Sequence, residues 1–206
     1  MLMVKTRIVE SKPALILQED KKHLVVADLH LGFEHILSSN KIFLGSNSSV
    51  KQITTNLKNL IRNENIDSVI LLGDIKSSIQ RISNTEWNDV PYFFEEIKKH
   101  VNLILVPSTL LSQVDSSIGG KNGINVSSEV GILKNQIGTF YQPSLVGINF
   151  QWLDSLPNDE VMSGWGEMLK HALLEGGSHL EDFRNLEPNL TSLSPFLIHS
   201  ARIKER

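Results

Sequence analysis

Three apolar runs of strand length alternate with two helical patterns in the first half of the chain, and this alternation constrains the fold more than any other feature. The runs are HLVVAD (His23–Asp28), DSVILLGD (Asp67–Asp74) and VNLILV (Val101–Val106). Between them, Ser49–Asn63 carries apolar residues at helical spacing, and Asn84–His100 is a second helical pattern in which Pro91 predicts a kink or a new start. An earlier run, Ala14–Gln18, predicts a strand that forms a hairpin with the first run or lies next to it in the sheet. Strands that alternate with helices are typical of a layered α/β fold with a mostly parallel sheet.

The composition is that of an ordinary globular protein. Hydrophobic residues make up 40% and charged residues 21% of the 206 residues, which allows one large domain or two small ones. The net charge of −3 gives no electrostatic basis for nucleic-acid binding, and the absence of cysteine excludes disulfides and thiolate metal sites. No apolar run reaches the roughly 18 residues of a membrane span, and the first residues contain no apolar stretch of signal-peptide length. We therefore expect a cytoplasmic protein without a nucleic-acid or membrane partner.

Polar side chains follow two of the apolar runs at the points where the strands end. Asp28 and His30 close the first run, and Asp74 follows Gly73 at the end of the second. Residues i and i+2 of a strand point the same way, and ligands collect at the carboxyl edge of a parallel sheet. Asp28, His30 and Asp74 therefore predict a site for Mn²⁺, Fe or Zn²⁺. The alternative is that the aspartates serve only as turn or helix-cap residues.

The first half carries motifs that resemble those of the calcineurin-like metallophosphoesterases. They are VVADLHLGFE, VILLGDIK and VNLILVP, and the resemblance covers about Ala14–Pro107. It implies that Asp28 and His30 bind one metal and that Asp74 bridges two, so that the pair holds a phosphate and activates a water. In that family the third strand continues into G-N-H-D or G-N-H-E, and later histidines complete the site. Here Pro107 is followed by STLLSQ, so we expect an incomplete phosphoesterase site.

From Ser108 onward the chain is predicted to be mostly α-helical. Ser108 or Thr109 is suited to cap a helix, and SSIGGKNG predicts a glycine-rich turn that brings Lys121 near a phosphate or carboxylate, unless it is only a surface turn. Further along, the sequence predicts a polar turn at Leu133–Pro143 and a strand at Ser144–Phe150. It then predicts a long helix at Asp159–Gly177 and a C-terminal amphipathic helix at Ser192–Arg206.

The two predicted helices near the C-terminus carry the remaining signals. In the long helix, Glu167, Lys170 and His171 share one face, where a solvated Glu–Lys pair is the simple interpretation. The other, apolar face of that helix comprises Val161, Met162, Trp165, Met168, Leu169 and Leu173. We expect the apolar residues of the last helix to lack packing partners within the chain; these are Leu193, Phe196, Leu197 and Ile203.

The second half resembles 3-dehydroquinate synthase over about Val106–Arg206. The motifs VPSTLLSQVDSSIGGKNGIN, KNQIGTFYQP and GWGEMLKHAL carry this resemblance, in that order and spacing. It implies an enzyme that uses NAD and a divalent metal, Zn²⁺ or Co²⁺, to convert a phosphorylated seven-carbon sugar acid into 3-dehydroquinate. The family enzyme oxidises the substrate transiently, eliminates phosphate, reduces the product and closes the ring. The resemblance also implies a homodimer.

The resemblance assigns roles to single residues. Glu167 is implied as a metal ligand, and Ser108, Thr109 and Lys134 are implied to lie near NAD. The residues implied to bind the small phosphorylated substrate are Asp115, Lys121, Asn135, Lys170 and Lys204, and the three lysines among them are the implied catalytic residues. Three lysines around a phosphate and a carboxylate suit the charge of such a substrate.

Both resemblances are incomplete. In the synthase family two further metal ligands are histidines beyond the segment that ends here at Arg206, and an N-terminal NAD domain with a G-G-G-V-x-x-D turn precedes the shared part. His171, one helical turn from Glu167, could stand in as a ligand. The simplest interpretation is a joined chain, with a partial metallophosphoesterase-like domain at 1–107 and a partial dehydroquinate-synthase-like segment at 108–206. We expect it to be inactive in both reactions; a non-catalytic α/β module that binds metal or anions is the alternative.

Overall fold

The chain forms two compact units. The computed structural model describes residues 4–31, 49–75, 84–128, 131–140 and 142–205, and their side chains except those of 84–89, 121–128 and 131–140. The first unit, here called the sheet unit, comprises Met1–Leu105, Asn122–Thr139 and Pro143–Leu145. The second, here called the helical unit, comprises Val106–Lys121, Phe140–Gln142 and Val146–Arg206.

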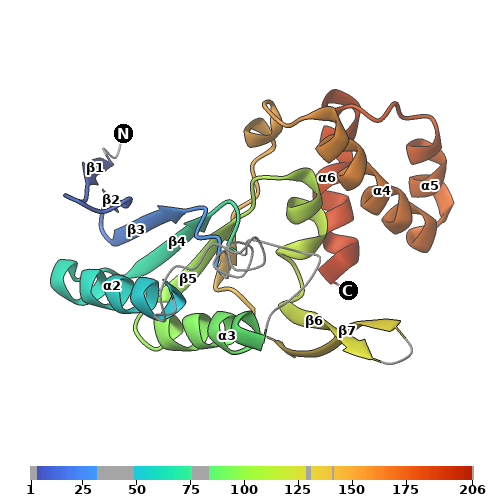
Figure 1. The fold of residues 1–206 in the computed structure, drawn as a ribbon. Helices are drawn as coiled ribbons and strands as arrows, with labels where there is room; N and C mark the ends of the chain where they lie inside the picture. The colour runs from blue at the N-terminus through green and yellow to red at the C-terminus, as the bar shows by residue number, and fades with distance from the viewer. Residues whose placement is uncertain (1–3, 32–48, 76–83, 129–130, 141, 206) are drawn as a thin grey trace. The chain divides into compact units, whose positions relative to one another are not determined.

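A mixed six-stranded sheet organises the sheet unit, with the strand order β1-β2-β3-β4-β5-β8 (Figure 1). The strands are β1 (Lys5–Ile8), β2 (Leu15–Gln18), β3 (Lys22–Ala27), β4 (Ser68–Leu72), β5 (Asn102–Val106) and β8 (Leu145–Val146). β1, β2 and β3 pair antiparallel, and β3 pairs with β4 in parallel, with Val25 opposite Ile70. The predicted hairpin, the parallel strand and the mixed α/β class are confirmed. The predicted strand at Ser144–Phe150 is reduced to β8, and just before it Ser144 N donates to Leu103 O at 3.0 Å.

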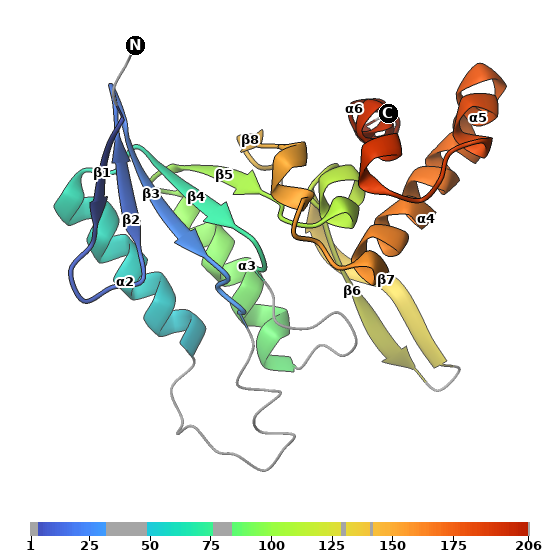
Figure 2. The same cartoon turned by 90° about the horizontal axis from the view of Figure 1, so that it is seen from above.

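Two helices lie side by side on one face of this sheet (Figures 1 and 2). α2 (Ser49–Glu64) buries Val50, Thr54, Leu57 and Ile61, which recur at helical spacing and form its sheet-facing stripe. α3 (Asn84–Lys98) buries Phe93 and Ile97 completely. Both predicted helices are confirmed, but the predicted new start at Pro91 is wrong, because α3 runs through this residue as one helix.

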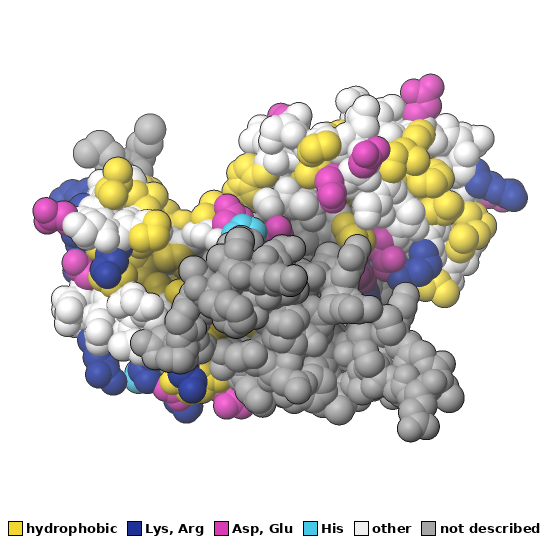
Figure 3. Space-filling view, in the orientation of Figure 1, with side chains coloured by type: hydrophobic (Ala, Val, Ile, Leu, Met, Phe, Trp, Pro, Cys, Tyr) yellow, Lys and Arg dark blue, Asp and Glu magenta, His cyan; other side chains and the backbone are white. Residues whose placement is uncertain are grey.

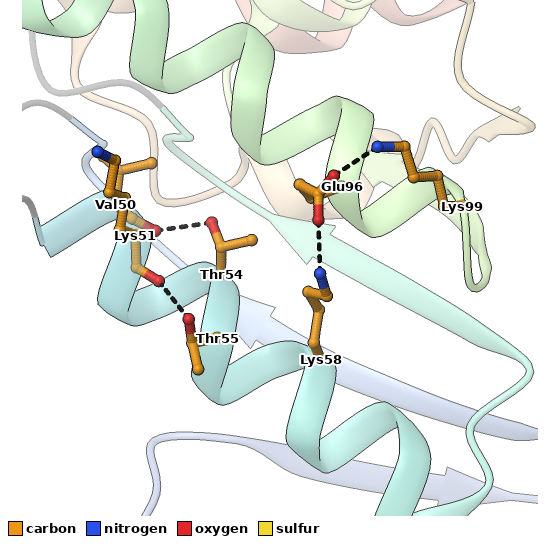
Figure 4. Close-up of polar contacts among 7 residues, drawn as sticks. All are labelled: Val50, Lys51, Thr54, Thr55, Lys58, Glu96 and Lys99. Carbon is orange, nitrogen blue, oxygen red and sulfur yellow. Dashed lines mark hydrogen bonds and ion pairs between the residues drawn. The ribbon is translucent and has the colours of Figure 1, made fainter.

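Lys58 of α2 and Lys99, just after α3, both pair with Glu96 of α3 (Figure 4). Hydrogen bonds from Lys58 first, and then from Lys99, lower the pKa of Glu96 from 4.5 to about 2. Because the carboxyl group binds its proton less tightly in the folded chain than in the unfolded chain, its contribution to stability is present above pH 4.5 and is lost as the pH falls towards 2.

We expect Glu96→Gln to reduce the loss of stability on acidification between about pH 4.5 and pH 2. The glutamine does not titrate, so this contribution to the pH dependence disappears. Urea unfolding at a series of pH values, followed by circular dichroism, measures the slope. Glu95→Gln removes a carboxyl group from the same helix outside the Lys58–Glu96–Lys99 triplet and serves as the control. Equal slopes for the two variants would contradict the expectation.

A two-stranded ribbon, β6 (Lys121–Ser128) and β7 (Gly131–Phe140), belongs almost wholly to the sheet unit. It corrects the polar turn predicted at Leu133–Pro143, most of which is strand. Pairing with β6 holds β7 as a strand, and a two-stranded ribbon tolerates polar residues because neither face has to be buried. The segment after Ser108 is therefore less helical than predicted, since it contributes β6, β7 and β8.

The helical unit packs short and long helices around one core. Its elements are the π-helical turn η1 (Ser112–Ser116), the 3₁₀ turn η2 (Phe150–Leu153), α4 (Asn158–Glu175), α5 (Gly177–Arg184) and α6 (Leu190–Glu205). The buried core comprises Leu110, Val114, Leu153, Val161, Met168, Ala172, Phe183, Leu193 and Leu197. The prediction that the apolar residues of the last helix lack partners is wrong, because Leu193 and Leu197 are buried in this core and Phe196 packs against it.

The buried face of α4 is rotated from the predicted one. Met162 and Leu173 remain 45% and 61% exposed, whereas Gly164, His171 and Ala172 are buried. Apolar side chains accordingly reach the surface over the helical unit (Figure 3). Of the helices that the structure describes, none combines the length and apolarity that crossing a membrane requires.

Candidate metal and anion site

The turn η1 carries Asp115, and reciprocal side-chain hydrogen bonds define the start of the helical segment that contains it. Ser112 N donates to Thr109 Oγ1 at 3.2 Å, and Thr109 N donates to Ser112 Oγ at 3.1 Å. This is the reciprocal arrangement of a capping box, with serine in the place of the usual glutamate or glutamine. Of the two cap residues that the sequence suggested, Thr109 is the one used.

The same segment is fixed from its buried side by Gln113. The fully buried side chain of Gln113 donates through Nε2 to Pro107 O at 3.2 Å and to Asn149 O at 3.1 Å. After it, Ser117 N reaches back to Ser112 O at 3.2 Å, the i to i+5 bond of a π-helical turn. Such turns are rare and occur often at functional sites. Asp115 lies within this turn, on a segment that is anchored at both ends.

Asp115 of η1 meets Glu167 and His171 of α4. One ligand atom from each of these residues lies within 4.8 Å of the other two. Among the described residues, this is the one group of three or more His, Asp or Glu side chains that converges in this way. Glu167 and His171 are one helical turn apart, and Glu167 Oε1 lies 3.2 Å from His171 Nε2. Asp115 reaches the pair because η1 packs against α4 within the helical unit.

The imidazole of His171 is buried, and the ring nitrogen that does not face Glu167 has a hydrogen-bonding partner. Its side chain is 2% exposed, and a 2.7 Å hydrogen bond joins Nδ1 to Ser200 Oγ of α6. Burial lowers the pKa of His171, and the nearby Glu167 carboxylate opposes this only in part. The imidazole is therefore neutral at pH 7, which is the form that binds metals. Metal-binding histidines commonly have their second ring nitrogen held by a hydrogen-bonding partner, as Ser200 holds Nδ1 here.

Two lysines border the three ligands. Lys170, in α4, forms an ion pair with Glu167 Oε1, and Lys204, in α6, lies with Nζ 2.6 Å from Asp115 Oδ1. The lysine side chains are 53% and 32% exposed, so both are open to solvent as well as to the carboxylates. The site thus brings together two carboxylates, a neutral imidazole and two ammonium groups from η1, α4 and α6.

The structure brings together only some of the residues that the sequence analysis singled out. Asp115, Glu167, Lys170 and Lys204 converge, and the side chains of Lys121, Lys134 and Asn135 lie outside the described part of the chain. The Thr109 hydroxyl is used in the helix cap, and Ser108 next to it is half-buried. Sequence reasoning missed Ser200 and did not consider Asp115 as a metal ligand. The i, i+4 spacing of Glu167 and His171 was the one available signal, whereas Ser200 lies 29 residues from His171.

The strand ends of the sheet unit give a different result. Asp28 and His30 follow β3 with φ of 47° and 43°, so the premise that they project from one side of an extended strand is wrong. Asp28 Oδ1 instead accepts a 3.0 Å hydrogen bond from Asp74 N, as a turn residue does. Gly73 permits this contact, because a Cβ at its position would lie 2.2 Å from Asp28 Oδ1. Among the described residues, Asp28, His30 and Asp74 do not form a three-ligand cluster, and the metal predicted here has no support from them.

Comparison with known proteins places the similarity in the middle and second half of the chain. A family model described as 3-dehydroquinate synthase N-terminal matches residues 91–163. The 3-dehydroquinate synthase of Pelagibacter ubique (strain HTCC1062) is 54% identical over 79 residues, which is 38% of this chain and 20% of the relative. The enzyme of Legionella pneumophila (strain Paris) is 46% identical over 101 residues, 48% of this chain and 26% of the relative. The chain thus spans a fifth to a quarter of the length of these curated relatives.

Solved structures resemble the chain only distantly. A 2-deoxy-scyllo-inosose synthase covers 90% of this chain at 18% identity with a TM-score of 0.47, and the chain covers 60% of it. A 2-epi-5-epi-valiolone synthase from Streptomyces hygroscopicus subsp. jinggangensis 5008, solved with NAD⁺ and Zn²⁺ bound, covers 87% at 15% identity with a TM-score of 0.44, and the chain covers 52% of it. These scores are too low to assign the fold of this chain to theirs.

Proposed function

We propose that the helical unit is the divalent-metal and substrate-phosphate binding part of an enzyme like 3-dehydroquinate synthase. The observation that carries this proposal is the convergence of Asp115, Glu167 and His171, with Lys170 and Lys204 beside them. The sequence similarity to curated synthases supports the same reaction class. In this proposal the substrate is a small phosphorylated sugar acid.

The residues present fit a divalent metal of the Zn²⁺ or Co²⁺ type. Two carboxylate oxygens and a neutral imidazole make a three-residue donor set, the number that catalytic zinc sites use. The burial of His171 and its bond to Ser200 fix the ring before any metal arrives. All three donors of this proposed set come from the described residues of the chain itself.

The charged residues have separate roles in the proposed reaction. A bound divalent metal would supply Lewis-acid polarisation of a substrate oxygen, and NAD would supply the transient oxidation. Lys170 and Lys204 would bind the phosphate and carboxylate groups of the substrate, which are anionic at neutral pH. Asp115 and Glu167 would orient the substrate through the metal that they hold. In this proposal Thr109 acts by shaping η1, since its hydroxyl is already used in the cap.

A metal titration of the 206-residue chain tests the proposal. We expect one saturable site for Co²⁺ or Zn²⁺ per chain, measured by calorimetry, with the visible absorption bands of bound Co²⁺ reporting imidazole and carboxylate ligation. Glu167→Gln should weaken binding by about a hundredfold or more, since even the loss of a residue that only supports a ligand costs 10- to 100-fold. His171→Leu should have a comparable effect, because it removes the one nitrogen donor.

Glu160→Gln is the matched control. It removes an exposed carboxylate from the first turn of α4 and leaves the site untouched, so it should bind metal as the unaltered chain does. Absence of saturable binding in the unaltered chain would refute the proposed metal site. The same holds if Glu167→Gln and Glu160→Gln bind metal equally well.

A further inference from the structure

Both carboxylates of the site already hold a cation supplied by the chain. Lys170 pairs with Glu167 through Oε1, the same oxygen that lies 3.2 Å from His171 Nε2. Lys204 pairs with Asp115 through Oδ1, and this pair connects α6 to η1. The ammonium groups therefore lie against carboxylate oxygens that a metal would need, so a bound metal and these two ion pairs compete for the same oxygens.

The charges of the five side chains cancel as they stand. Asp115 and Glu167 carry two negative charges and Lys170 and Lys204 carry two positive charges, and the ring of His171 adds none in the neutral form that binds a metal. A divalent cation added to this set gives a net charge of two positive units. The site is then attractive for a phosphate dianion, which it is not while the lysine charges are matched by the carboxylates.

We infer that Lys170 and Lys204 are exchangeable counter-cations, which neutralise Glu167 and Asp115 in the metal-free chain and turn to an anionic ligand once metal has replaced them. The inference rests on the metal site proposed above and adds an order of binding to it. Metal comes first, and the phosphate group follows. Each ligand then raises the affinity of the site for the other by the same factor, because binding linkage is reciprocal.

The lysines are suited to this exchange, whereas the ligands are suited to stay. Lys170 is 53% exposed and Lys204 is 32% exposed, so each ammonium can exchange its carboxylate contact for water, and the more exposed Lys170 does so at the smaller cost. By contrast, Glu167 is 16% and His171 2% exposed, and the imidazole is held by Ser200. The two donors on α4 are therefore well buried, Asp115 is 27% exposed, and each lysine is more exposed than the carboxylate that it contacts.

The test is to measure metal affinity in the absence of any anion other than chloride. Lys170→Met should tighten Zn²⁺ or Co²⁺ binding by about fivefold, since it removes both the competing contact and the repulsion of a nearby positive charge. Lys204→Met should tighten metal binding by a similar factor, because it removes the ammonium group that contacts Asp115. Calorimetry with the full chain gives these affinities, and circular dichroism checks that each variant is folded. Arg202→Met is the control: it removes one positive charge from α6, two residues from Lys204, where the helix turns it to a different face.

The second measurement uses methylphosphonate, a soluble phosphate analogue, with and without saturating metal. In the unaltered chain we expect metal to raise methylphosphonate affinity by about tenfold or more, and Lys170→Met to lose most of that gain. Metal affinity that stays unchanged or falls in both lysine variants would overturn the exchange, even if the metal site itself exists. Equal tightening in Arg202→Met would also overturn it, since the effect would then be one of net charge alone. Failure of the unaltered chain to bind metal would instead refute the proposed function.

Discussion

Phe183→Ala should lower the free energy of unfolding of the helical unit by about 3–5 kcal/mol, the usual cost of deleting a buried aromatic ring. Phe183 is 1% exposed and joins α5 to the rest of the core. Its ring stacks on Trp165 of α4 with centroids 6.1 Å apart and meets Phe196 of α6 edge-on at 5.8 Å. Truncation leaves a cavity between three helices, and the helices can close it only in part. Urea unfolding followed by circular dichroism measures the loss.

Leu174→Ala is the control for this change. Leu174 lies on α4, is 72% exposed and should therefore change stability by less than about 0.5 kcal/mol. A loss below about 1 kcal/mol for Phe183→Ala would show that α5 is not part of the same cooperative core as α4 and α6.

Gly164→Ala and Gly166→Ala should change stability in opposite directions, although both glycines lie within α4. A Cβ at Gly164 would lie 2.4 Å from Leu110 Cγ and 2.6 Å from Leu110 Cβ, and Leu110 is fully buried. The helices must move apart to admit it, so we expect a loss of about 1–3 kcal/mol, after the gain in helix propensity has been offset. At Gly166 no heavy atom other than its immediate neighbours and the nearby backbone of α4 lies within 4 Å of the added carbon, and the alanine should stabilise the helix by about 0.5–1 kcal/mol.

The same unfolding measurement decides both glycine variants. Gly164→Ala also bears on the site, because Leu110 leads directly into η1, which carries Asp115. Weaker metal binding in Gly164→Ala, with unchanged binding in Gly166→Ala, is the expected companion result. Stabilisation by both alanines would show that α4 and the Leu110 segment do not approach as closely as described.

Local patterns predicted most elements correctly and failed where pairing or packing with another segment decides the structure. The order of strands and helices from β3 to β5 could be predicted, because the apolar residues of each element have the length and period of a strand or a helix. The strand β7 was not readable, since GILKNQIGTF has polar residues and glycines typical of a turn and becomes a strand only by pairing with β6. The burial of Leu193 and Leu197 was likewise missed, because their partners lie on η1 and α4.

The sequence by itself determined the strand and helix periods of the chain and the spacing that sets Glu167, Lys170 and His171 on one side of α4, since these depend only on local geometry. Only the tertiary structure decided that Asp115 joins Glu167 and His171, that Ser200 holds the imidazole, and that Lys204 pairs with Asp115. Contacts of this kind depend on how η1, α4 and α6 pack, which local pattern does not encode. The tertiary structure also decided that Asp28 accepts a hydrogen bond from Asp74 N and acts as a turn residue. The positive φ values of Asp28 and His30 belong to the segment after β3, and the pattern of the strand does not encode them.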